Sequence, residues 1–137
     1  MIAKISLYSI ALMIVLLVGC DPGSAYYYSI NNKSNEPVTV CFSYKDEDKI
    51  QCRTVPEGDS VVFDSVFLNI KGRDYGDNFL KEFYDTVNIK AGNKILQKDI
   101  YNRNSWSFSS SERGKVGMID SKINNYSITI EDKSFQK

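Results

Sequence analysis

The chain has 137 residues, and its 17 Lys and Arg residues balance 17 Asp and Glu residues, with no histidine. This length suits one domain. A chain with no excess of basic residues lacks the electrostatic footprint of a nucleic-acid-binding protein, so nucleic acid is excluded as a partner. Without an imidazole, Ser-His-Asp and Cys-His catalysis and most catalytic zinc sites are excluded as well. Carboxylate-only chemistry, as in glycoside hydrolysis, stays open.

The first twenty residues have the anatomy of a bacterial secretion signal. Lys4 is the only charged residue of this segment, and it precedes the uncharged apolar run of residues 5–18. A membrane-spanning helix needs roughly 20 apolar residues, and this run is shorter, so a retained transmembrane anchor is the weaker alternative. We therefore predict that residues 1–19 form a signal peptide that is removed from the mature protein.

Residues 17–20 read Leu-Val-Gly-Cys and resemble the lipobox of bacterial lipoproteins. In that family the cysteine thiol is alkylated by diacylglycerol, the chain is cut before the cysteine, and the new amine is often acylated. The resemblance implies that Cys20 is the lipidated first residue of a protein held on a membrane of the cell envelope. The outer membrane is favoured, but Asp21 leaves the choice open, because an acidic residue at this position signals inner-membrane retention in some Gram-negative bacteria.

The mature chain is predicted to consist of a short lipidated tether, residues 20–25, and a single domain, residues 26–137. Removing residues 1–19 takes away Lys4 alone, which leaves 16 basic against 17 acidic residues and a formal charge of −1. Because five extended residues reach at most about 17 Å, the domain is expected to lie close to the bilayer.

Eight segments of the domain have strand character. In chain order they are residues 26–30, 38–44, 50–55, 60–67, 86–90, 94–100, 106–108 and 126–131. Two of them, 38–44 and 126–131, alternate strictly between apolar and polar or small residues, which is typical of a strand buried on one face. Segment 60–67 is almost continuously apolar around Asp64, which indicates a strand of the core.

Turn formers and charges separate these segments. Residues 45–49 form a charged hairpin tip, 56–59 contain a proline and a glycine suited to a turn, and 91–93 suit a hairpin turn. Asn78 is expected to cap a short helix that runs through Tyr84. Residues 109–117 contain glycine and lysine but lack the Gly-Lys-Ser/Thr end of a phosphate loop, so they are expected to be a flexible connection.

Many short strands without repeated crossover helices favour antiparallel pairing. We predict an all-β, immunoglobulin-like antiparallel β-sandwich with room for one short helix. The proline-glycine turn, the late Trp106 and the final Tyr-x-Ile-x-Ile strand at 126–130 resemble small uncharacterised lipoproteins of Gram-negative gut anaerobes. That resemblance implies an envelope location and a β-sandwich fold.

Two cysteines lie on the two arms of the first predicted hairpin. Pairing Tyr44 with Lys49 across the tip puts Cys41 opposite Cys52, and the oxidising compartment favours a disulfide between them. One point against this register is that it turns Ile50 outward and Gln51 and Arg53 toward the core. A bulge or a slip of one residue would part the two cysteines. A catalytic redox pair is the weaker alternative, since the Cys-x-x-Cys spacing is absent.

Three aromatic residues, Tyr75, Tyr101 and Trp106, lie in or beside predicted loops. Flat aromatic faces there could stack on sugar rings or anchor a protein partner, so these residues are the candidate ligand-binding site. The alternative is core and edge packing, which is favoured for Trp106.

Asp74, Asp77 and Asn78 supply oxygen ligands of the kind that calcium prefers. Their spacing does not match an EF-hand, so solvated loop residues are the favoured interpretation. We expect no metal site, no cofactor and no catalytic residue.

The leading hypothesis is therefore a non-enzymatic lipoprotein, anchored through Cys20, that serves as a binding or accessory module for another protein of the cell envelope. Its loops are expected to carry recognition. The main alternative is a carbohydrate-binding accessory protein, which requires at least two coplanar exposed aromatic rings. A small carboxylate-dependent hydrolase is the third hypothesis, and it requires paired acidic groups in a cleft.

Overall fold

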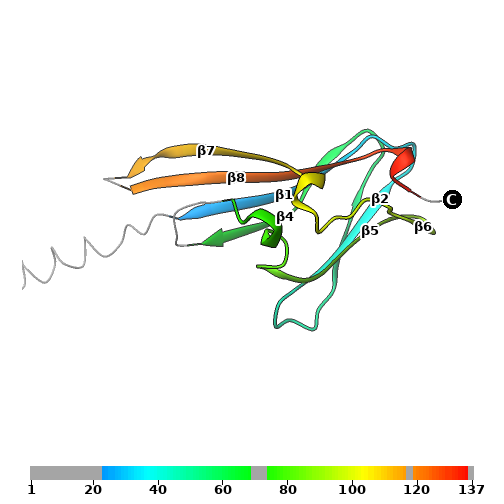
Figure 1. The fold of residues 1–137 in the computed structure, drawn as a ribbon, viewed down its shortest axis with the longest axis horizontal. Helices are drawn as coiled ribbons and strands as arrows, with labels where there is room; N and C mark the ends of the chain where they lie inside the picture. Colours follow the sequence, from blue (N-terminus) through cyan, green and yellow to red (C-terminus); the bar gives the residue numbers. More distant parts are fainter. Residues whose placement is uncertain (1–22, 69–73, 117–118, 136–137) are drawn as a thin grey trace, which may run out of the picture.

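The computed structural model describes residues 23–68, 74–116 and 119–135, in which two four-stranded sheets pack face to face (Figure 1). Sheet A has the spatial order β4 (Ser60–Leu68), β1 (Ser24–Asn32), β8 (Ile119–Ile130) and β7 (Ser107–Val116). Sheet B has the order β3 (Gln51–Val55), β2 (Val38–Tyr44), β5 (Tyr84–Ala91) and β6 (Lys94–Ile95). The predicted all-β sandwich is confirmed.

The N-terminal predictions, the signal peptide at 1–19 and lipidation of Cys20, lie outside the described residues. β1 begins at Ser24, two residues before the strand expected from Tyr26. Within the described ranges, no helix has the length and apolar character needed to cross a membrane.

The centre of sheet A joins the first and last strands of the domain. β1 pairs with β4 in antiparallel orientation and with β8 in parallel orientation, in register from Ser24 opposite Lys122 to Asn32 opposite Ile130. Sheet A is therefore mixed, whereas all pairs of sheet B are antiparallel. Side chains alternate along a strand whichever way its neighbour runs, so the sequence pattern carried no sign of the parallel pair.

Tyrosine rings fill the space between the sheets. Tyr28 of β1 stacks on Tyr126 of β8 with ring centroids 5.4 Å apart, and meets Tyr84 of β5 edge to face at 5.3 Å. All three residues are buried, and the Tyr28 hydroxyl donates a hydrogen bond to the Phe79 carbonyl oxygen at 2.9 Å. Because these rings come from both sheets, Tyr28 connects the two layers of the core.

The predicted helix from Asn78 to Tyr84 is wrong. The structure has a 3-10 turn, η1 (Gly76–Asn78), followed by turns in which the Tyr84 N–H donates to the Leu80 carbonyl oxygen at 2.9 Å. Phe79 and Leu80 are buried as their spacing indicated, but Tyr84 already opens β5, which leaves no room for a further helical turn.

Two other segments differ from prediction. β6 covers only Lys94–Ile95 instead of 94–100, and Leu96 beyond it makes an isolated bridge with Phe135. The expected flexible connection at 109–117 lies mostly within β7, which pairs with β8 from Ser107 opposite Ser127 to Val116 opposite Ile119. The long partner strand satisfies the backbone hydrogen bonds of this serine-rich segment, so its polar composition does not prevent strand formation.

The predicted register of the first hairpin is confirmed. Cys41 lies opposite Cys52 in the β2–β3 ladder, and their Sγ atoms are at disulfide distance, 2.10 Å. Ile50 does point outward, with 66% of its surface exposed. β3 is an edge strand in which only Val55 is buried, so an outward Ile50 is compatible with this register.

Removing this crosslink is expected to destabilise the domain. In the chain-entropy model, a disulfide that closes a loop of this length contributes about 3 kcal/mol by restricting the unfolded chain. The double variant Cys41→Ser/Cys52→Ser should therefore unfold at lower urea concentration than the oxidised parent. The matched control is the reduced parent, which should unfold like the variant. Equal urea midpoints for the variant and the oxidised parent would contradict the expectation.

Candidate functional site

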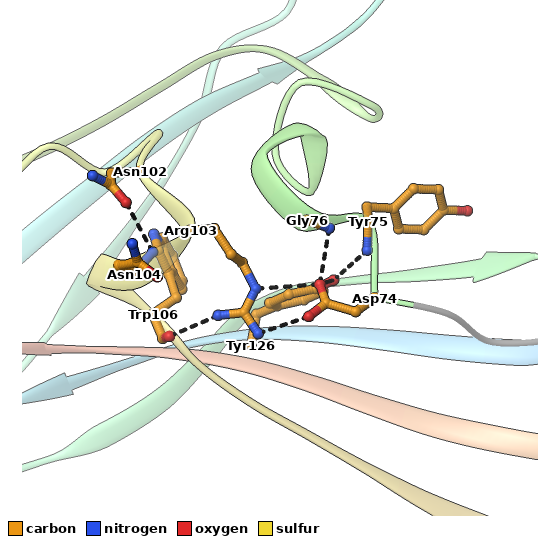
Figure 2. Close-up of polar contacts among 8 residues, drawn as sticks. All are labelled: Asp74, Tyr75, Gly76, Asn102, Arg103, Asn104, Trp106 and Tyr126. Atoms are coloured by element: carbon orange, nitrogen blue, oxygen red, sulfur yellow. Dashed lines mark hydrogen bonds and ion pairs between the residues drawn. The ribbon is translucent and has the colours of Figure 1, made fainter.

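An arginine joins the two loops that contain the predicted aromatic residues. Arg103, in the 3-10 turn η2 (Arg103–Ser105), donates to both carboxylate oxygens of Asp74, with Nε to Oδ1 at 3.2 Å and Nη2 to Oδ2 at 2.9 Å (Figure 2). Its Nη1 donates to the Trp106 carbonyl oxygen at 2.8 Å. The guanidinium also lies over the Tyr126 ring, 5.2 Å from the centroid, so Arg103 holds the loops to each other and to sheet A.

Three residues donate hydrogen bonds to the carboxylate of Asp74. Besides Arg103, the Tyr126 hydroxyl donates to its Oδ1 at 2.8 Å and the Gly76 N–H donates to the same atom at 3.0 Å. Burial raises the pKa of Asp74, but the hydrogen bonds from Arg103, Tyr126 and Gly76 outweigh it and hold the pKa below its usual value. A general acid needs the opposite shift. The contacts also occupy both carboxylate oxygens of Asp74, one of the three residues of the calcium alternative.

The three predicted ligand-binding aromatics do not form an exposed platform. Trp106 is only 4% exposed, its Nε1 donates to the Ile100 carbonyl oxygen at 2.7 Å, and its ring packs on Phe79 at 5.3 Å. It belongs to the core, as the alternative interpretation held. Strand β7 begins one residue later. The side chain of Trp106 lies between the sheets rather than in solvent.

Tyr75 and Tyr101 are half-buried and pack against the edge of the core. The Tyr101 hydroxyl accepts a hydrogen bond from the Val87 N–H at 3.0 Å and donates to the Val87 carbonyl oxygen at 3.3 Å. The Tyr75 ring points away from the Asp74–Arg103 pair in Figure 2 and contacts the Tyr26 ring at 5.4 Å. Both rings therefore serve packing on at least one side.

A second polar cluster, centred on Asp64 of β4, links the two sheets. Its Oδ1 accepts a hydrogen bond from the Tyr44 hydroxyl at 2.7 Å, and its Oδ2 accepts one from the Tyr84 hydroxyl at 2.5 Å. The two tyrosine rings, both from sheet B, stack with centroids 5.6 Å apart. Burial and the hydrogen bond to Asp64 raise the pKa of each phenol. The sequence showed a lone charge in an apolar strand, but not its partners.

This cluster predicts a loss of stability at alkaline pH. A free tyrosine titrates near pH 10, and the pKa values of Tyr44 and Tyr84 are raised above that value in the fold. The stability they contribute is therefore fully present below about pH 10 and is lost as the pH rises toward the folded values. The free energy of unfolding, measured by urea titration between about pH 8 and pH 12, should fall above pH ~10.

The variant Tyr44→Phe should flatten this pH dependence, because it removes one phenol that must stay neutral. Tyr27→Phe, which makes the same change of phenol to phenyl ring outside the cluster, is the matched control. Equal slopes for Tyr44→Phe and the parent would show that Tyr44 does not contribute to the alkaline transition.

A groove of about 550 Å³ lies where the segment after β6 meets the end of β8 and the 3-10 turn η3 (Asp132–Ser134). Its lining residues are Gln97, Lys98, Thr129, Glu131, Lys133 and Ser134. The Gln97 N–H donates to the Ser134 carbonyl oxygen at 2.8 Å, and Lys98 Nζ donates to the Thr129 carbonyl oxygen at 3.3 Å. These hydrogen bonds fix the two sides of the groove to each other. No sequence motif marks it, since its residues are far apart in the chain.

The groove and the start of the domain lie at opposite ends of the sandwich. Figure 1 shows η3, β6 and the end of β8 at one end, and the beginnings of β1 and β8 with the end of β4 at the other. In the described part of the chain, no group of three or more His, Cys, Asp and Glu residues could hold a metal ion. Comparison with protein-family models, with curated proteins and with solved structures gave no match.

Proposed function

We propose that the protein is a lipid-anchored lipoprotein of the bacterial cell envelope that acts as a non-enzymatic binding or accessory module. The proposal rests on one observation. The groove lies at one end of the sandwich, and the strand that follows the lipobox-like sequence begins at the opposite end. A protein anchored at Cys20 would hold its membrane-proximal end at the bilayer and present the groove to other envelope components. A groove lined by polar and charged residues, which also expose aliphatic surface in it, suits recognition of a partner.

The chemistry of the groove favours a polar segment of another envelope protein. Lys98 and Lys133 supply two ammonium groups against the single carboxylate of Glu131, which is already paired with Lys133 at 2.8 Å. Ile95, which is 74% exposed, lies two residues before Gln97 in the chain. An acidic segment with an adjacent apolar side chain would match this combination, because it supplies the missing negative charge and covers Ile95.

A photo-crosslinking amino acid placed at Gln97 of the full-length, membrane-anchored protein tests this proposal in the cell. A partner held in the groove should give a discrete crosslinked product at this position. The matched control is the same amino acid at Asn88, an exposed position in the middle of β5, where the product should be absent.

The charge reversal Lys98→Glu should weaken the Gln97 crosslink, because it removes one of the groups expected to attract the partner. Products of equal yield at Gln97 and Asn88, or no product at Gln97, would contradict a binding role for the groove. Turnover of a glycan or peptide by the purified protein would overturn the non-enzymatic part of the proposal.

A further inference from the structure

An apolar patch covers the outer face of sheet A at the end where β1 begins. Tyr26 and Tyr28 of β1 point into the core, so Ala25 and Tyr27 project from the opposite face. In the ladder, Ala25 lies between Phe67 of β4 and Ile123 of β8. The Tyr27 and Phe67 rings meet edge to face with centroids 6.4 Å apart. We call Ala25, Tyr27, Phe67 and Ile123 the basal patch.

The basal patch is most exposed at Phe67, on the edge strand β4. The Phe67 side chain is 66% exposed. Tyr27 and Ile123 are half-buried, and Ala25 is only 4% exposed at the base of the patch. Ser65 and Asn125 lie beside Tyr27 in the ladder, and further along this outer face Val62, opposite Ser29, is 52% exposed. The most exposed apolar side chain described on this face, Phe67, thus lies at the end nearest the lipobox-like sequence.

We propose that the basal patch docks on the surface of the lipid bilayer and orients the domain upon it. This inference rests on the proposed lipidation of Cys20. Ala25 follows Cys20 by five residues, which span at most about 17 Å when fully extended. A lipid-modified Cys20 would hold the patch within that distance of the headgroups, so the bilayer is the apolar phase within its reach.

The side chains suit such a contact. Tyrosine is enriched at membrane interfaces because its ring is apolar and its hydroxyl is polar, and Phe67 beside Tyr27 adds apolar area that water now covers. The contact needs no basic residues, so it should form on a zwitterionic bilayer and persist in high salt. Docking through this end would direct the groove at the other end away from the surface.

Carbene labelling from within the bilayer tests the orientation. The full-length protein, lipidated and processed in its own bacterium, is reconstituted into phosphatidylcholine vesicles that contain a phospholipid with a diazirine on its acyl chain. After irradiation, adducts are located by peptide mass spectrometry. Phe67 should carry roughly tenfold more adducts than Ile95, because burial of one phenylalanine side chain favours the docked orientation by at least that factor.

Ile95 is the matched control, since it is 74% exposed but lies at the opposite end of the sandwich. Phe67→Ser should reduce labelling at Tyr27 and Ile123 without releasing the lipid-anchored protein from the vesicles, whereas Ile95→Ser should change neither. Equal labelling of Phe67 and Ile95 on protein that sediments with vesicles would overturn the docking. Basal patches crosslinked between two copies, with no lipid adducts, would assign the surface to a dimer instead. Protein that fails to sediment would instead contradict the lipid anchor.

Discussion

Replacing Tyr28 by alanine is expected to lower the free energy of unfolding by about 3–5 kcal/mol, the range for removing a large aromatic side chain from a packed core. The ring stacks on Tyr126 and contacts Tyr84 from the other sheet, and it is fully buried. Its loss would leave a cavity between the sheets. A domain of this size has roughly 5–15 kcal/mol of stability, so urea titration should show a large fall in the midpoint.

Tyr28→Phe separates the contribution of the ring to stability from that of its hydroxyl. This variant loses only the hydrogen bond to the Phe79 carbonyl oxygen, which should cost about 1–3 kcal/mol because a buried acceptor is left unpaired. Tyr27→Ala, on the neighbouring outward position of β1, should cost less than Tyr28→Ala. If Tyr27→Ala destabilised the protein as much as Tyr28→Ala, the assignment of Tyr28 to the centre of the core would be wrong.

The second large effect is expected at Cys20. Replacing residues 1–20 by a secretion signal of the type that leaves no lipid should move the protein from the membrane fraction to the soluble fraction of the envelope. Acyl chains contribute about 0.8 kcal/mol per buried methylene, and the sum over the methylenes of two or more chains far exceeds what the basal patch supplies. Cys20→Ser within the natural signal should prevent lipid attachment in the same way.

Fractionation of cells that express each variant, followed by immunoblotting, measures the change. Cys41→Ser/Cys52→Ser is the matched control, since it alters two other cysteines and should leave the protein on the membrane. A Cys20→Ser protein that remains on the membrane and is cut at the same site would refute the lipoprotein assignment.

Strand positions were predictable wherever one face of a strand is buried. Val38, Val40 and Phe42 alternate with smaller or polar residues, and the structure buries these three in β2. The hairpin geometry then placed Cys41 opposite Cys52. Local patterns succeed here because the period of two reflects burial directly.

Long-range pairing was not predictable in the same way. Ser109 and Ser110 form part of β7 only because β8 offers them a partner, and a serine-rich segment has no apolar face of its own. The parallel contact between β1 and β8 joins residues about a hundred positions apart. The sequence of neither strand indicates the direction of its neighbour. The sequence could therefore indicate a sandwich but not the mixed order of sheet A.

The candidate site was likewise predictable from local patterns but not from contacts between distant segments. Trp106 was recognised as a core residue from its aromatic character, but its hydrogen bond to the Ile100 carbonyl oxygen depends on the conformation of the loop. Asp64 was visible as an isolated charge, whereas the hydroxyls that bind it come from two other strands. The groove was missed altogether because it is formed by backbone segments that meet only in the fold.

The mass of the N-terminal peptide of the protein extracted from bacterial membranes tests the central claim, a lipid anchor at Cys20, most directly. We expect a peptide that begins at Cys20 and carries diacylglycerol on the thiol, with or without a further acyl chain on the amine. A peptide that retains residues 1–19, or one that begins elsewhere with Cys20 removed or unmodified, would contradict the claim.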